Sequence, residues 1–270
     1  MSPVPNGHST TGPEAPRSLS DDLSRSDDLA TLYPFLYAHP ENVGQNSPGA
    51  GNLEAVLAEV RRSTVDKVHQ IVALRQEVLA QESQRLAACA SAMAESFANG
   101  GRLFAIGNGG SCTDAADLAS LFLHPGPGWR ALPAFALTGD IAVLTALSND
   151  VSFDVVFARQ IAAFGRRGDV VVGLSTSGNS TNLVRAFQEA SRRGLLTVGL
   201  AGYEGGAMAE LGSIDHLFVV PSDSVHRIQE AQTTIYHTLW ELTLNELTTG
   251  RRDPAQVERR EVARGVGDHG

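Results

Sequence analysis

The chain has 270 residues, of which 42% are hydrophobic, and its formal net charge is −9. This is enough apolar material for the core of one folded domain, and the negative charge argues against a general nucleic-acid-binding surface. The sequence has two cysteines without metal-ligand spacing, no membrane-length apolar run and no basic-then-apolar leader, so we expect a cytoplasmic protein without a disulfide framework or a direct nucleic-acid or membrane partner.

The two ends of the chain differ in composition from its middle. Residues 1–50 are rich in Pro, Gly, Ser, Asn and Asp, which predicts a disordered or loosely docked extension. An apolar island at residues 29–37 is a candidate for docking on the domain or on a neighbouring subunit. Residues 251–270 are charged and contain glycines, which predicts a flexible tail. The folded domain, with its leading helical region, is therefore expected within residues 51–250.

A long helical region opens this domain. Between residues 53 and 97, apolar side chains recur at steps of three and four residues, which predicts one long helix or a pair of helices. These side chains are Val65, Val68, Val72, Leu79, Leu86, Ala90, Met93 and Phe97. We expect this face to pack against the sheet that follows.

Five short apolar runs then alternate with helix-like segments. The runs cover residues 103–106, 134–137, 170–174, 196–200 and 217–220. Continuous apolar strands alternating with helices indicate a parallel sheet covered on both faces, so we predict a three-layer α/β sandwich with a five-stranded parallel sheet. Gly194 follows two arginines and predicts the end of the helix before the fourth strand. A last amphipathic helix is expected over residues 226–247.

A hydroxyl-rich loop follows the third predicted strand directly. Its residues are Ser175, Thr176, Ser177, Gly178, Asn179 and Ser180, and a helix begins at Thr181. At this junction side-chain hydroxyls and free backbone N–H groups converge at the positive end of a helix dipole. The loop therefore predicts a phosphate-binding site.

A second loop of this kind follows the first predicted strand, before a helix expected over residues 113–122. Its residues are Gly107, Asn108, Gly109, Gly110 and Ser111. Glycines permit positive φ and let a ligand approach the main chain closely. In an open parallel sheet the ligand crevice lies outside the carboxyl ends of the strands, so we expect the two loops to serve one site.

These two loops, together with Asp114-Ala115, Ser148-Asn149-Asp150 and Arg227-Ile228-Gln229-Glu230, resemble the sugar isomerase (SIS) domain. More narrowly, the chain resembles the phosphoheptose isomerase branch of carbohydrate metabolism, which interconverts sedoheptulose 7-phosphate and a heptose phosphate. The resemblance runs from about Val65 to Leu247. It implies the SIS fold, a sugar-phosphate ligand and a homo-oligomer, most simply a homotetramer, that the long helical region helps to assemble.

The predicted substrate-binding residues combine the two loops with the family's other positions. They are Asn108, Gly109, Gly110, Ser111, Asp150, Ser175, Thr176, Ser177, Asn179, Ser180 and Gln229.

The predicted catalytic helix departs from the family pattern. An aldose–ketose isomerase moves a proton between adjacent carbons and needs a base and an acid. In the phosphoheptose isomerases that the chain resembles, this helix has the pattern Asp-Ala-x-His-x-x-x-Glu. Here Asp117 stands in the histidine position and Leu121 in the glutamate position. Leucine can neither accept a proton nor bind a metal. Asp117 is therefore the candidate substitute base.

The last helix keeps more of the pattern. Gln229 and His237 are eight residues apart and lie on nearly the same helix face. The resemblance implies that they match a metal-binding glutamine and a histidine that is both ligand and general acid. Asp117, Gln229 and His237 are thus candidates for a reduced metal site, with zinc as the candidate ion, and the missing fourth ligand predicts weak binding or none.

Two functions remain open on these residues. One is isomerisation of sedoheptulose 7-phosphate or a similar sugar phosphate, with His237 and Asp117 as catalytic groups. The other is a non-catalytic phosphosugar-binding or regulatory protein related to the DnaA initiator-associating family, which residues 140–150 also resemble. Leu121 favours binding alone, and His237 favours an enzyme.

Overall fold

The computed structural model describes residues 50–249. The predicted extension and its apolar island, and the predicted tail, lie outside the described residues. The described part divides into two units at Ser63 and Thr64. Residues 50–63 form the first turns of helix α3 (Ala50–Ala98), and residues 64–249 hold the rest of that helix and the whole sheet. The predicted helical region is thus one continuous helix.

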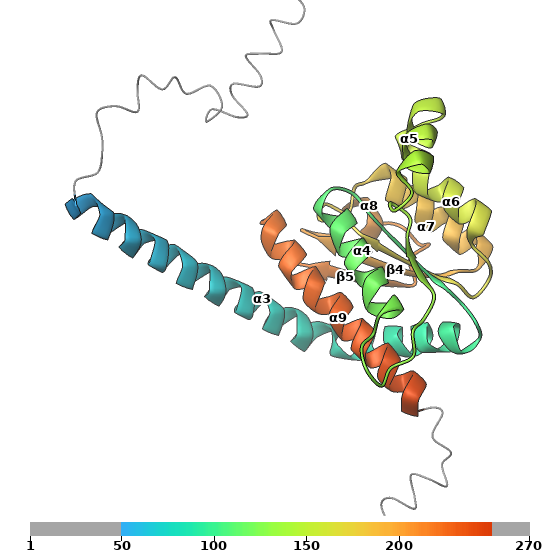
Figure 1. The fold of residues 1–270 in the computed structure, drawn as a ribbon, viewed down its shortest axis with the longest axis horizontal. Helices are drawn as coiled ribbons and strands as arrows, with labels where there is room; N and C mark the ends of the chain where they lie inside the picture. The colour runs from blue at the N-terminus through green and yellow to red at the C-terminus, as the bar shows by residue number, and fades with distance from the viewer. Residues whose placement is uncertain (1–49, 250–270) are drawn as a thin grey trace, which may run out of the picture. The chain divides into compact units, whose positions relative to one another are not determined.

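Within residues 50–249, five parallel strands form a single sheet in the order β2-β1-β3-β4-β5 (Figure 1). Their bounds are β1 (Leu103–Gly107), β2 (Ala134–Ala136), β3 (Val170–Leu174), β4 (Leu196–Gly202) and β5 (His216–Val220). Every residue of β1 and β3 is buried, as expected for strands covered on both faces. The predicted parallel five-stranded sheet is confirmed.

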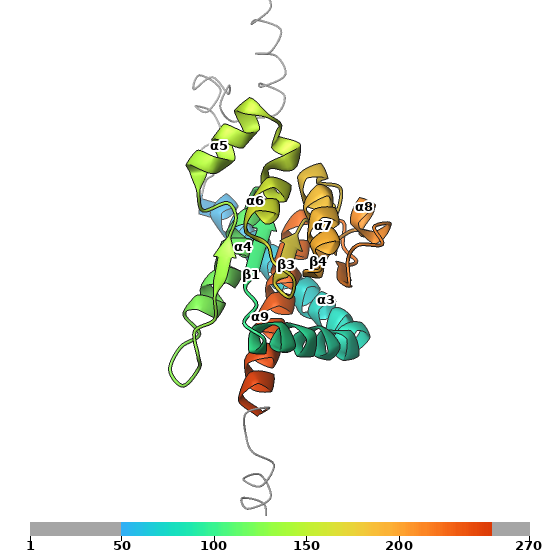
Figure 2. The same ribbon diagram turned by 90° about the vertical axis from the view of Figure 1, so that its right-hand side faces the viewer.

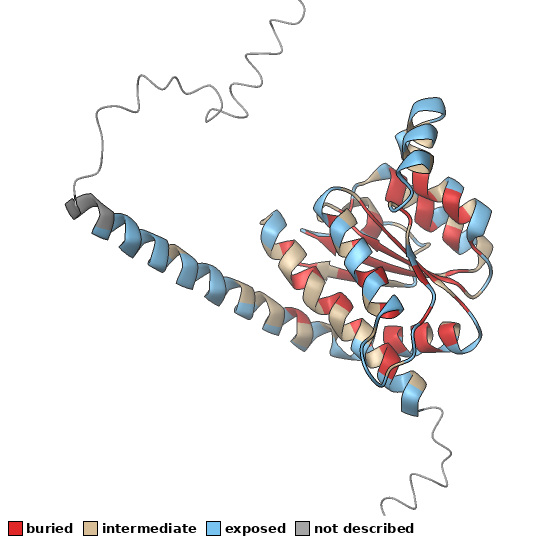
Figure 3. Ribbon diagram, viewed as in Figure 1, coloured by how far each residue is buried: buried red, intermediate tan, exposed pale blue. Residues whose placement is uncertain are grey.

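Helices cover both faces of the sheet (Figure 2). Besides α3 they are α4 (Gly110–Leu123), α5 (Ile141–Asp150), the 3-10 turn η2 (Phe153–Val155), α6 (Val156–Phe164), α7 (Thr181–Arg193), α8 (Gly206–Ala209) and α9 (Val225–Thr249). One apolar cluster joins α3, α4 and α9 to one face, and a second joins α6, α7 and α8 to the other. Figure 3 shows the buried residues concentrated in the sheet and on the helix faces that meet it. The three-layer sandwich is confirmed.

Two glycines set helix boundaries beside the predicted loops. Gly109 has a φ of +55° at the N-cap of α4, so the chain turns at once and the helix begins at Gly110 rather than at the predicted Thr113. Gly194 has a φ of +75° at the C-cap of α7, and its N–H donates to the carbonyls of Ala190 and Ser191. The predicted stop at Gly194 is therefore confirmed.

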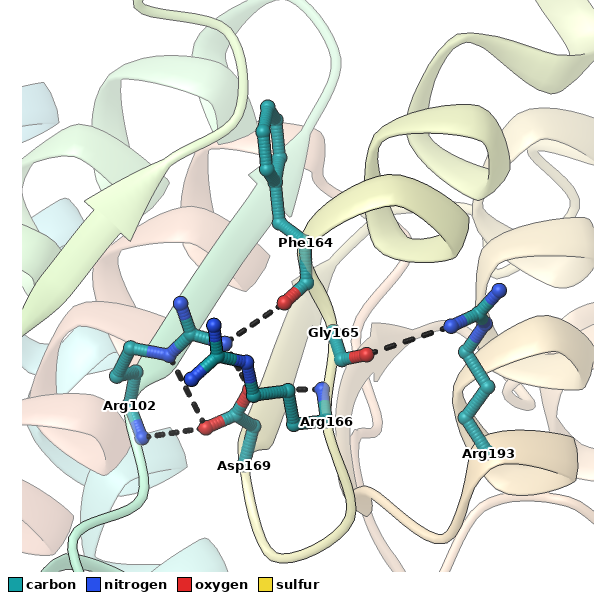
Figure 4. A network of polar contacts seen from close by, with 6 residues as sticks. All are labelled: Arg102, Phe164, Gly165, Arg166, Asp169 and Arg193. Carbon is teal, nitrogen blue, oxygen red and sulfur yellow. Dashed lines mark hydrogen bonds and ion pairs between the residues drawn. The ribbon is translucent and has the colours of Figure 1, made fainter.

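A buried carboxylate joins β1 to β3 at their amino ends (Figure 4). Asp169 is 3% exposed and accepts hydrogen bonds from the backbone N–H and the guanidinium of Arg102, which stands just before β1. Asp169 also accepts from the backbone N–H of Arg166 at 2.9 Å, and Arg102 donates to the carbonyl of Phe164 at 2.7 Å. This cluster fixes the amino ends of β1 and β3, at the sheet edge opposite the loops that follow these two strands.

Among residues 50–249, none of the helices combines the length and the apolar content that a membrane span requires.

Candidate functional site

The two predicted loops meet where the strand order reverses. The chain leaves β1, adds β2 on one side, and returns to place β3 on the other side of β1. The loops after β1 and β3 therefore lie together at the carboxyl edge of the sheet, the usual ligand site of such folds. Asn108 and Asn182 join them, because their side-chain amides exchange two hydrogen bonds of 2.9 and 3.0 Å.

The loop after β3 is held in shape by its own hydroxyls. Ser175 is buried, and its Oγ accepts a hydrogen bond from the Gly178 N–H at 3.0 Å. Ser177 Oγ accepts from the Asn179 N–H at 3.2 Å. Gly178 has a φ of +67°, and a Cβ there would collide with the carbonyl of Gly205. The loop is therefore preorganised before any ligand binds.

The start of α7 is arranged to receive an anion. Within the described part of the chain, the side chain of the N-cap Ser180 makes no capping hydrogen bond, although its carbonyl accepts from Leu183. The hydroxyl of Ser180 lies 3.4 Å from that of Ser175. Hydroxyl donors and first-turn N–H groups thus meet at the positive end of the α7 dipole. This geometry supports the predicted phosphate site.

Two predicted loop residues have further roles inside the protein. Asn179 is exposed, and its side-chain carbonyl accepts from the Ala207 N–H at 2.8 Å, which ties the loop to α8. Ser111 is 4% exposed at the start of α4. Asn179 therefore also stabilises the loop after β3, whereas Ser111 presents little surface to a ligand.

A groove of about 730 Å³ opens beside this loop, beyond the carboxyl ends of β4 and β5. Its lining residues are Ser177, Asn179, Tyr203, Glu204, Gly206, Pro221, Ser222 and Asp223. The groove offers carboxylate acceptors next to the hydroxyls of the loop. It has room for a polyhydroxylated ligand.

Helix α9 contacts both loops through two glutamines. Gln232 is fully buried, and its amide donates to the Ser175 carbonyl at 3.3 Å. A Cβ at Gly110 would collide with the amide of Gln229, so this predicted residue lies directly against the first loop. Sequence reasoning missed Gln232 and Asn182. The sequence could have indicated both residues, because each is a polar residue among apolar ones on the predicted buried face of a helix.

The predicted catalytic residues also come together, with a third partner. Tyr236 donates its hydroxyl to Asp117 Oδ2 at 2.8 Å, and His237 Nε2 lies 3.6 Å from the same oxygen. The side chains of Asp117 and His237 are 50% and 42% exposed, whereas Tyr236 is 2% exposed. Burial, and next the hydrogen bond to Asp117, raise the pKa of Tyr236, so its hydroxyl stays protonated as a donor.

The family model of the SIS domain matches residues 68–202, which are half of the chain. The phosphoheptose isomerase of Roseiflexus sp. is 38% identical over 182 residues, which are 67% of this chain and 91% of that protein. That of Geotalea daltonii is 44% identical over 178 residues, 65% of this chain and 92% of that protein. The structure of phosphoheptose isomerase GmhA from Neisseria gonorrhoeae has a TM-score of 0.63 and 33% identity, covering 68% of this chain and 98% of its own.

The chain belongs to the SIS domain family. Its resemblance to the phosphoheptose isomerase branch, predicted from the loops, is confirmed.

The residues that would hold a metal in this SIS domain do not form a closed cage. Leu121 packs on the apolar cluster under α4 and presents no donor atom. Gln229 and His237 are about 12 Å apart along α9, and the Gln229 amide lies against Gly110. Across residues 50–249, no group of three or more His, Cys, Asp or Glu side chains could hold a metal ion. Only Asp117 and His237 of the predicted ligands meet, so the donor set does not fit zinc.

Asp150 stays apart from this SIS site. It ends α5, is exposed, and accepts a hydrogen bond from its neighbour Asn149 at 2.8 Å. None of the ten residues of α5, all of which are described, is buried, and the helix projects from the sandwich (Figure 1). Within one chain, therefore, the described contacts do not join Asp150 to either loop. Its role in substrate binding stays a prediction.

Asp114 carries an unfavourable charge beside the site. Its Oδ2 is buried without a hydrogen-bond partner among the described residues. Burial, and then the charge of Asp117, raise the pKa of Asp114 above its usual value. A carboxyl group with a higher pKa in the folded state binds its proton more tightly there. The group therefore lowers the free energy of unfolding more and more as the pH rises above the pKa that it has in the unfolded state.

Asp114→Asn is therefore expected to raise the melting temperature at pH 7. The gain should be about 1 to 2 °C, because solvent partly screens the charge of a carboxyl group that is only partly buried. It should shrink towards about pH 4, where Asp114 is increasingly protonated in both states. Calorimetric melts of both proteins across this pH range check the prediction. A gain that grew at acid pH would contradict it.

Proposed function

We propose that the protein binds a sugar phosphate where the carboxyl ends of β1 and β3 meet. The observation that carries this proposal is the start of α7, where the uncapped Ser180 hydroxyl and the first-turn N–H groups converge on a preorganised loop. Membership of the SIS family and the names of the phosphoheptose isomerase relatives support the choice of ligand. Sedoheptulose 7-phosphate is the first ligand to test.

We further propose that the site belongs to an aldose–ketose isomerase. In such a reaction a base removes the proton from the carbon next to the carbonyl, an enediol forms, and an acid returns a proton to the neighbouring carbon. His237 is half-exposed beside the Asp117 carboxylate, so an imidazole and a carboxylate face solvent together. His237 is assigned the acid–base role, and Asp117 is its partner or substitute base.

One observation favours the second function, a non-catalytic phosphosugar-binding or regulatory protein. Leu121 stands where the resemblance places a carboxylate, and it packs on the apolar core. A protein that retains the phosphate loop but has lost this group binds the sugar phosphate without efficient turnover.

The phosphate site is tested by replacing Ser175 and Ser180 together with alanine. A hydrogen bond to a charged group contributes about 2 kcal/mol, so the double variant should bind sedoheptulose 7-phosphate at least tenfold more weakly. Isothermal titration calorimetry measures the affinity, and circular dichroism checks that the domain stays folded. Ser191→Ala is the matched control, because Ser191 lies on the same helix near its other end. Equal affinities of the double variant and the wild type would contradict a phosphate site at Ser175 and Ser180.

We propose that the active form is a homo-oligomer, most simply a tetramer. Val65, Val68 and Val72 are each about half exposed along α3. Helix α5 has no buried residue although six of its ten residues are aliphatic, and Ile141 is 63% exposed. Apolar faces of this kind are typical of subunit interfaces. Light scattering at micromolar concentration should give the mass of four chains, and a monomer would contradict the proposal.

We also propose that the protein acts in the cytoplasm as a single SIS domain spanning residues 51–250. The free thiols of Cys89 and Cys112 support a reducing compartment.

A further inference from the structure

Tyr236 joins the interior of the protein to the candidate catalytic groups. Its ring is among the largest fully buried side chains, and its hydroxyl reaches the half-exposed carboxylate of Asp117. The residue that follows it on α9 is His237. The proposed function does not assign Tyr236 a role.

We propose that Tyr236 is a positioning residue whose hydroxyl fixes the Asp117 carboxylate beside His237, so that a tyrosine–aspartate–histidine cluster occupies the place of a metal site. This inference rests on the proposed function for its meaning. Its contacts, however, can be tested without a sugar phosphate.

Tyr236 and Asp117 differ in burial. A half-exposed aspartate on a helix surface samples several rotamers, because solvent satisfies its oxygens in each. The Tyr236 hydroxyl is tied to a ring held by the core, so it can bond Asp117 in only one place. The hydrogen bond therefore selects one rotamer of Asp117.

His237 lies close to Asp117 but makes no hydrogen bond to it. The 3.6 Å between His237 Nε2 and Asp117 Oδ2 is too long for a direct hydrogen bond. The carboxylate thus lies near the imidazole without occupying its nitrogen, which stays available to a ligand. The His237 ring also meets Trp240 edge-on, with centroids 6.2 Å apart. The imidazole is oriented from two sides.

The groups around Asp117 do not fit a metal. A carboxylate oxygen has two lone pairs, so the Tyr236 hydrogen bond does not by itself exclude a cation from Asp117. The number of ligands does, because Leu121 offers no donor atom and the Gln229 amide lies against Gly110. Asp117 and His237 alone are too few ligands for zinc, so the phenol and not a metal orients the carboxylate.

Crystal structures of the full chain test this inference. In the wild type, Asp117 is expected in one rotamer, with its Oδ2 on the Tyr236 hydroxyl and 3.6 Å from His237 Nε2. In Tyr236→Phe the carboxylate loses this partner and should spread over several rotamers. Tyr203→Phe, at a partly exposed tyrosine in the groove, is the matched control and should keep Asp117 as in the wild type. An Asp117 side chain in the same single rotamer in Tyr236→Phe would overturn the inference.

A second measurement keeps the test decisive if Tyr236→Phe does not fold. Zinc titration of the wild type and of Asp117→Asn should give the same weak affinity or none, because Asp117 and His237 alone do not make a zinc site. Wild-type zinc binding that Asp117→Asn reduces tenfold would overturn the inference. Titration of the same samples with sedoheptulose 7-phosphate separates this outcome from failure of the proposed function.

Discussion

Wild-type protein incubated with sedoheptulose 7-phosphate is expected to isomerise it about 100 to 10,000 times more slowly than an ordinary phosphoheptose isomerase. This is the range that a positioned acid or base contributes, and Leu121 stands at the position where the resemblance places the carboxylate base. The phosphate loop after β3 does not depend on this position. Binding and turnover should therefore separate, with sugar-phosphate binding retained and conversion slow. An assay that resolves ketose from aldose phosphate measures the rate.

The companion variant restores the family arrangement with Asp117→His and Leu121→Glu. The two new side chains lie four residues apart on α4 and share a face that meets α9. We expect turnover to rise, because the variant restores the carboxylate that Leu121 lacks. Fast wild-type isomerisation that His237→Ala leaves unaffected would show that other groups carry out the chemistry.

Asp169→Ala is expected to lower the free energy of unfolding by about 3 to 5 kcal/mol. The substitution leaves the largely buried Arg102 without its ion-pair partner at 2.7 Å, and it leaves the backbone N–H groups of Arg102 and Arg166 unsatisfied. Urea denaturation of both proteins measures the difference. Because Asp169 lies at the sheet edge opposite the loops, sugar-phosphate affinity of the folded variant should change little.

An exposed ion pair supplies the control for this stability prediction. Asp154 lies 3.4 Å from Arg185, and both side chains are nearly half exposed. Asp154→Ala should change the free energy of unfolding by less than about 1 kcal/mol, because solvent screens such pairs. Equal losses in the two variants would mean that burial of Asp169 does not determine its contribution.

Most of the fold could be predicted because its strands are continuous apolar runs. The bounds of β3 were predicted to the residue, while β4 extends two residues further, to Gly202. Those extra residues pair with β5, a tertiary contact that no local pattern reports. The position of both loops at one sheet edge followed from the parallel arrangement alone.

The contacts inside the site could not be predicted in the same way. Tyr236 and Asp117 are 119 residues apart, and their hydrogen bond depends on how α9 docks on α4. The amide pair of Asn108 and Asn182 similarly spans 74 residues. A helical pattern placed His237 and Gln229 on one face but did not show that Gln229 turns to Gly110. Side-chain direction is decided by packing between elements.

A crystal structure of the protein with sedoheptulose 7-phosphate is the decisive measurement for the proposed site. The phosphate oxygens are expected to accept hydrogen bonds from the Ser180 hydroxyl and from the first-turn N–H groups of α7. The sugar carbons nearest the carbonyl are expected within reach of His237. A phosphate bound away from residues 175–183, for example at the far side of the groove near Asp223, would show that the site is wrong.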